Sequence, residues 1–372
     1  MPVRVSKQMY HPDNLDTFFG SMLETLSGVS QYPEFSVFMN SPFFYLRTSL
    51  LLASITITGS LSSAHAEPVP EGLLGDWTLD LDSGAPAWMR VEEREGKHVA
   101  WMRIYIGPVG PYENAEVKNG RLHFELKKQK KKGAPTSQRV EVGLKEGALN
   151  GTIRRELPDG TWEEISFTGK RIPPMPKAPD LSEVHFGHPI SLFNGRDLTG
   201  WVAHEPEKNM GWTAKDGLLV NSTPKTDFSA TGDHANLKTE AHFEDFWLHV
   251  EFLIGAQRNS GIYLRGTYEA QVVDRDSRMQ GLQGAGAIFG QILPTENAGR
   301  PGGKWQSYDI TLVDRHITVI LNGVKVIDNQ PVTMPTAGAI NTDPYAPGPI
   351  YFQGDHTSVS YRNIYLAPVI KE

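Results

Sequence analysis

The chain has 372 residues, which is enough for two or three domains of ordinary size. Its 36 Lys and Arg residues against 43 Asp and Glu residues give a formal net charge of −7, so it lacks the basic excess typical of proteins that wrap nucleic acid. Cysteine is absent, which excludes disulfides, thiolate metal sites and cysteine nucleophiles. The 36 Gly and 26 Pro residues favour short strands joined by many turns.

Residues 1–66 have the pattern of a leader that carries a secretory signal. An apolar run at 50–61 is too short to cross a bilayer, follows Arg47 and precedes an Ala-His-Ala cleavage signal. Met39 lies at the usual distance upstream for the true start, which leaves open whether residues 1–38 are translated. We therefore expect an exported protein, periplasmic or extracellular, without a membrane span in the mature chain. The alternative is a buried core segment that follows a disordered leader.

A proline-rich stretch at 172–184 predicts a linker, because proline sustains neither helix interiors nor central strands. Residues 67–171 before it predict a small all-β domain, β-barrel-like or a β-sandwich, in which apolar and polar residues alternate at 121–126. A Lys-rich run at 127–133 is either a solvated hairpin tip or a site for an anionic partner. We find no catalytic constellation in this part, and the sequence leaves its role open.

Residues 185–372 contain many strand signals and no long amphipathic helix. An Asn-Gly pair at 322–323 predicts a tight hairpin between two apolar runs. So many antiparallel strands predict an all-β, jelly-roll sandwich of two sheets, in which one face stays open for sugars. The predicted strands are 246–254, 260–265, 268–274, 305–313, 316–321 and 358–366.

This second part resembles the 3-keto-disaccharide hydrolase family, a concanavalin A-like lectin and glucanase sandwich group. The resemblance opens with the sequence SLFNGRDLTGW at 191–201 and runs in order over about half of the chain. It includes the segments 212–218, 237–240, 243–246, 259–265, 268–274, 286–290, 303–309, 321–323, 352–356 and 361–364. Phe352 and Tyr361 stand where the family often has Leu and Phe, and both replacements keep an apolar side chain.

A carboxylate and an amide are predicted to lie side by side in the strand at 268–274. Glu269 and Gln271 are two residues apart, so they share one face of this strand, and Tyr268 faces the other way. Arg265 precedes them across a short turn and is expected to approach Glu269. The alternative from spacing alone is an ordinary surface salt bridge between these two residues.

His356 lies in a polar loop between two predicted strands. It is a general base, a metal ligand or a donor that stabilises the loop, and the sequence leaves these three roles open. Arg362 on the following strand either stabilises an oxyanion or pairs with Asp355. Glu240 is either a catalytic or binding residue or a solvated Glu at a strand edge.

The resemblance implies a hydrolase that cleaves the glycosidic bonds of 3-keto-sugars. A ketone at C3 acidifies the proton on C2, so one base, one oxyanion stabiliser and a polar cleft suffice for elimination at C1, after which water adds. Glu269 or His356 is then the base, and Arg265 and Arg362 hold the oxyanion or hydroxyls. Substrate binding falls to Gln271, Asn259, Gln353, Glu240 and Asp355.

A divalent cation held by Asp274 and Glu269 is a further possibility, although no known metal-binding spacing supports it. The predicted partner is a carbohydrate substrate, and no nucleic acid partner is expected. The alternative function is a non-catalytic carbohydrate-binding module of the same fold. Linkage, aglycone and assembly state cannot be derived from the sequence.

Overall fold

The computed structural model describes residues 67–104, 109–126, 138–157, 159–224 and 233–371. The predicted leader and the Lys-rich run lie outside these residues, so their interpretation stays a prediction. Strands and loops make up most of the described chain, with single 3₁₀ turns at η2 (Glu71–Leu73) and η3 (Gly281–Gln283). None of the helices among the described residues has the length and apolar character that crossing a bilayer requires.

The N-terminal strands form one antiparallel sheet in the order β3-β2-β1-β8-β7-β6-β5-β4. This is the order of an up-and-down barrel that is open between β3 and β4, and an isolated bridge from Ala100 to Tyr112 lies at the opening. At 121–126 the side chains of Leu122 and Phe124 are buried, as the alternation predicts. The barrel-like form of the prediction is therefore the correct one. The strands are β1 (Gly75–Leu81), β2 (Pro86–Arg94), β3 (Lys97–Ile104), β4 (Glu116–Lys118), β5 (Arg121–Leu126), β6 (Gln138–Lys145), β7 (Ala148–Glu156) and β8 (Trp162–Ile172).

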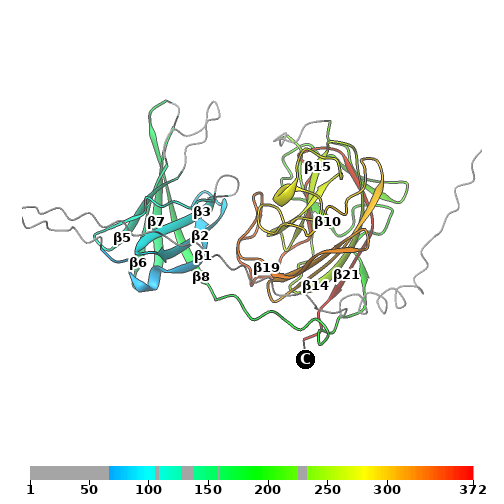
Figure 1. Cartoon of the computed structure of the whole chain (residues 1–372). Helices are drawn as coiled ribbons and strands as arrows, with labels where there is room; N and C mark the ends of the chain where they lie inside the picture. The colour runs from blue at the N-terminus through cyan, green and yellow to red at the C-terminus, as the bar shows by residue number, and fades with distance from the viewer. Residues whose placement is uncertain (1–66, 105–108, 127–137, 158, 225–232, 372) are drawn as a thin grey trace, which may run out of the picture. The chain divides into compact units, whose positions relative to one another are not determined.

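The C-terminal strands form two sheets, as the jelly-roll prediction requires. Figure 1 shows β10 and β15 in one sheet and β14, β19 and β21 in the other. The smaller sheet has the order β10-β13-β20-β15-β16, with strands β10 (Trp201–Ala203), β13 (Leu237–Thr239), β15 (Asn259–Leu264), β16 (Tyr268–Val273) and β20 (Tyr351–Phe352). The larger sheet has the order β11-β12-β21-β14-β17-β18-β19, and β9 pairs with β21. Its strands are β9 (Ile190–Ser191), β11 (Trp212–Lys215), β12 (Leu218–Asn221), β14 (Phe246–Ile254), β17 (Trp305–Val313), β18 (His316–Leu321), β19 (Val324–Pro331) and β21 (Val359–Pro368).

One hydrophobic core fills the space between these two sheets. Alternate residues of β14, such as Leu248 and Phe252, face residues such as Ile262 and Ala270 of the smaller sheet. Burial of these apolar side chains is the main stabilising contribution to the sandwich. Because Tyr268, Ala270 and Val272 belong to this core, the intervening side chains of β16 lie on the opposite face, as predicted.

The sequence signals locate the six predicted strands of the sandwich within one or two residues at each end. The predicted strands at 246–254, 305–313 and 316–321 coincide with β14, β17 and β18. The Asn-Gly hairpin is also confirmed, because Leu321 pairs with Val324 and both turn residues have positive φ, 54° at Asn322 and 84° at Gly323. Two of the correctly predicted strands, β15 and β16, carry the candidate residues Asn259, Glu269 and Gln271.

Candidate functional site

The hairpin of β15 and β16 sets the register of the site. Tyr263 lies directly opposite Glu269, and Gly261 lies opposite Gln271. These four residues occupy the face of the smaller sheet that points away from the hydrophobic core. A side chain at Gly261 would overlap the Glu269 carboxyl, so the glycine makes room for it.

A cavity of about 220 Å³ lies over this face. Its polar wall contains predicted site residues from three separate parts of the sequence. The polar lining residues are Asn236, Asn259, Glu269, Gln353, Asp355 and His356. The rest of the lining consists of Tyr263, Met279, Phe289, Ala337, Gly338 and Tyr351. The volume and the mixture of polar and aromatic groups are suited to a single sugar ring.

Glu269 lines this cavity and is buried, with 3% of its surface exposed. Burial disfavours the charged carboxylate and raises the pKa of Glu269 to about 8, and the negative charge of Asp355 acts in the same direction. The Tyr263 hydroxyl, 3.0 Å from Oε2, partly opposes this rise in pKa. Near neutral pH the side chain is therefore mostly a carboxylic acid that has a proton to donate.

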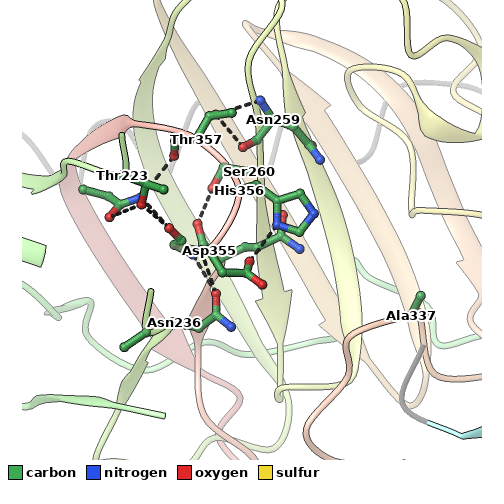
Figure 2. Close-up of polar contacts among 12 residues, drawn as sticks. Thr223, Asn236, Asn259, Ser260, Ala337, Asp355, His356 and Thr357 are labelled. Carbon is green, nitrogen blue, oxygen red and sulfur yellow. Dashed lines mark hydrogen bonds and ion pairs between the residues drawn. The ribbon is translucent and has the colours of Figure 1, made fainter. Parts of the chain in front are cut away.

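His356 and Asp355 also line the cavity and form a hydrogen-bonded pair (Figure 2). Nδ1 of His356 lies 2.6 Å from Oδ1 of Asp355. Because a carboxylate only accepts, Nδ1 carries the proton, and Nε2 is the nitrogen that can take another. Oδ1 of Asn236 accepts from the backbone N–H groups of Gly354 and Asp355, at 2.7 and 3.2 Å, and so holds the loop in place.

Two amide side chains of the cavity have oxygens that lack partners among the described residues. These are Oδ1 of Asn259 and Oε1 of Gln353, and the two residues are only 6% and 9% exposed. The Thr357 hydroxyl lies 2.9 Å from the backbone N and 2.7 Å from the backbone O of Asn259, and Ser260 Oγ donates to the Gln353 carbonyl at 2.8 Å. A buried, unsatisfied acceptor costs about 1–3 kcal/mol, so this wall is suited to a ligand with hydroxyl donors.

The prediction that Arg265 approaches Glu269 is wrong. Arg265 has a left-handed backbone, φ 55°, which takes it out of the alternation of β15. Its guanidinium is buried and forms an ion pair with Asp245, and it also donates to the carbonyls of Glu244 and Pro344. It does not line the cavity. Arg265 therefore fastens the turn to the rest of the sandwich instead of taking part in chemistry.

We expect Arg265→Ala to lower the free energy of unfolding by about 3–5 kcal/mol, because it leaves the Asp245 carboxylate buried without its cationic partner. Urea denaturation followed by Trp fluorescence measures this change. Equal stability of the variant and the wild type would contradict the structural role.

Arg362 and Gln271 also lie outside the cavity. Arg362 belongs to β21 in the larger sheet, where Nε donates to Glu251 at 2.6 Å and the guanidinium lies 4.0 Å from the ring centre of Trp305. Arg362 therefore does not join the other predicted residues at the cavity, and it forms a structural ion pair as in the alternative prediction, although with Glu251 and not with Asp355. Gln271 shares a face with Glu269, but its side-chain amide donates to the Gln283 carbonyl and accepts from the Val272 backbone N–H.

Glu240 is exposed just after β13 and does not reach the cavity either. Asp274 is buried and accepts from the Gln257 backbone N–H at 2.7 Å, so its carboxylate holds a turn. In the part of the chain that the structure describes, no group of three or more His, Asp or Glu side chains is placed to hold a metal ion. The donor set does not fit the predicted cation site of Asp274 and Glu269.

Tyr263 and Asn236 are among the cavity residues that sequence reasoning did not select. For Tyr263 a signal was present, since strand alternation and the short turn at 265–267 place it opposite Glu269. Asn236 carries no such signal, because it meets the loop at 354–355 only through the pairing of β13 with β20.

The sandwich is similar to proteins that act on or bind carbohydrates. A protein from Parabacteroides distasonis, provisionally described as a glycosyl hydrolase, has 22% identity over 49% of this chain and 94% of its own, with a TM-score of 0.40. The carbohydrate-binding module CBM66 from Bacillus subtilis has 14% identity over 45% and 94%, with a TM-score of 0.29. Porphyranase B from Zobellia galactanivorans has 10% identity over 54% and 100%, with a TM-score of 0.32.

A search of curated proteins returned no match. The family comparison matches residues 188–367 to the 3-keto-alpha-glucoside-1,2-lyase-like domain. This range contains both sheets of the sandwich except for the last residue of β21, and it contains every residue that lines the cavity. Over these residues, slightly less than half of the chain, the sequence is therefore similar to the 3-keto-alpha-glucoside-1,2-lyase-like domain family.

Proposed function

We propose that this protein cleaves the glycosidic bond of a 3-keto-glycoside in the cavity over β15 and β16. The observation that carries the proposal is that a buried Glu269, whose pKa is raised to about 8, and a His356–Asp355 pair line the same small cavity. Two titratable groups held in different protonation states are the usual basis of paired acid and base catalysis.

His356 is the base in this reaction. Nε2 takes the C2 proton, which the neighbouring C3 ketone makes acidic, and Asp355 stabilises the resulting imidazolium through Nδ1. The electron pair of the broken C–H bond forms the C2–C3 enolate. Compared with the sequence-based assignment, which left His356 and Glu269 open as the base, the buried acid makes Glu269 the less suitable candidate.

Glu269 is the acid. When the enolate collapses, the C1–O bond breaks, and the leaving oxygen takes the proton of the Glu269 carboxyl. The products are an unsaturated keto-sugar and the free alcohol, and addition of water to the former completes a net hydrolysis. The unpartnered oxygens of Asn259 and Gln353 accept from sugar hydroxyls and orient the ring.

The purified protein is expected to release the alcohol from a 3-keto-glucoside or 3-keto-trehalose but not from the unoxidised sugars, because only the ketone acidifies C2. Mass spectrometry of both products measures the reaction. Binding of an unoxidised glycan without turnover of either keto-sugar would favour the alternative, a non-catalytic carbohydrate-binding module.

Asn259→Ala and Gln353→Ala are each expected to raise KM about tenfold, since each removes a buried acceptor for a sugar hydroxyl. Gln330→Ala removes an amide that lies outside the cavity and serves as the control. Unchanged KM values in both cavity variants would show that these amides do not bind the substrate.

A further inference from the structure

The Tyr263 hydroxyl has two acceptors and one proton. Its oxygen lies 3.0 Å from Oε2 of Glu269 and 2.7 Å from the backbone oxygen of Ala337. Tyr263 is fully buried. Within the described residues, it is the side chain that donates to the Glu269 carboxyl.

A backbone carbonyl accepts a hydrogen bond at all times, whereas a carboxyl group accepts far more strongly once it is ionised. The preferred acceptor of the phenol proton therefore depends on the state of Glu269. We infer that Tyr263 is a positioning residue whose hydroxyl proton turns from Ala337 to Glu269 when Glu269 gives up its own proton. The role of Tyr263 in catalysis rests on the proposed function, in which Glu269 becomes a carboxylate during bond cleavage.

The surrounding chain holds the phenol oxygen between these acceptors. Gly338 has a φ of 82°, and a Cβ atom there would lie 2.7 Å from the Tyr263 hydroxyl, so glycine allows the 337–338 segment to approach this closely. The Tyr263 ring packs edge-on against Tyr351, with 4.8 Å between ring centres. Thr336 Oγ1 accepts from the backbone N–H of Glu269 at 3.0 Å, which ties the same segment to β16.

Apart from this hydrogen bond, burial and nearby charge act on the Glu269 carboxyl. Burial has the largest effect and raises the pKa of Glu269, and the negative charge of Asp355 raises it further. The neighbouring Tyr351 is a neutral side chain of the same cavity. The Tyr263 hydroxyl is thus the contact that can follow the ionisation of Glu269 by a small rotation of one O–H bond.

The decisive experiment titrates Glu269 itself in the full chain, without any substrate. Infrared difference spectra of the wild type and of Tyr263→Phe, assigned by their loss in Glu269→Gln, give the fraction of protonated carboxyl at each pH. We expect Tyr263→Phe to raise the titration midpoint by about one pH unit, because the carboxylate loses a charge-assisted hydrogen bond. An unchanged or lower midpoint would overturn the inference.

A second, kinetic experiment uses a 3-keto-glucoside that the wild type turns over. Tyr263→Phe is expected to lower kcat at least about tenfold with little change in KM, and to move the alkaline limb of the kcat profile upward. Tyr308→Phe also loses a buried phenol, which donates to the Gln271 carbonyl outside the cavity, and is expected to leave the profile in place. Equal shifts in both variants would indicate a merely structural effect. If the wild type cleaves no keto-sugar, the proposed function fails, and the infrared titration still decides the role of Tyr263.

Discussion

His356→Ala is expected to lower kcat on a 3-keto-glucoside by about 10²- to 10⁴-fold, the usual contribution of a positioned general base. The side chain lines the cavity, and its Nδ1 is occupied by Asp355 at 2.6 Å, so Nε2 is the basic atom available to the substrate. Loss of the imidazole leaves the C2 proton without a base. Steady-state kinetics with the keto-sugar, together with exchange of the C2 proton in deuterated water, measure the loss.

Two further variants separate chemistry from folding. His242→Ala changes an exposed histidine outside the cavity and is expected to retain activity. Asp355→Asn keeps the shape of the loop but weakens the support of Nδ1, and we expect an intermediate loss of kcat. Retention of wild-type activity in His356→Ala would exclude this residue as the base.

Glu269→Gln is expected to reduce kcat by a similar 10²- to 10⁴-fold, because the amide has the size of the neutral acid but cannot protonate the leaving oxygen. The wild type itself is expected to lose activity as the pH rises above about 8, where the acid ionises. As the control, Glu240→Gln makes the same change at an exposed carboxyl outside the cavity and should leave kcat unchanged.

The pH dependence of stability gives Glu269→Gln a second readout that needs no substrate. The pKa of Glu269 is raised in the folded chain from 4.5 to about 8, so its favourable contribution is fully present below the unfolded value and is lost as the pH rises through the folded one. The Glu269→Gln variant has no ionisable group at this position, so its stability does not fall in this way as the pH rises. We expect equal unfolding free energies near pH 4 and a variant that is more stable by on the order of a few kcal/mol above pH 8. A constant difference between pH 4 and pH 9 would mean that Glu269 ionises normally.

Local patterns were sufficient to predict six strands of the sandwich and the faces of their side chains. The alternation of side chains in β14 and β16 is a property of extended backbone, and it shows which residues enter the core before any partner strand is known. The same rule placed Glu269 opposite the core. The sequence also predicts site roles for Asn259, Gln353, Asp355 and His356, and the cavity brings these residues together with Glu269.

By itself, the sequence determined an all-β chain with a two-sheet C-terminal sandwich, its similarity to one family over residues 188–367, and the strand face on which Glu269 lies. These depend on residues close together in the chain or on long ordered matches. Only the tertiary structure decided the partners of the charged groups. Arg265 pairs with Asp245 and Arg362 with Glu251, whereas the cavity receives Tyr263 and Asn236, which sequence reasoning did not select. Ion pairs form between whichever charges the packing of strands and loops brings within a few ångströms, and distances across the fold are not encoded by spacing along the chain.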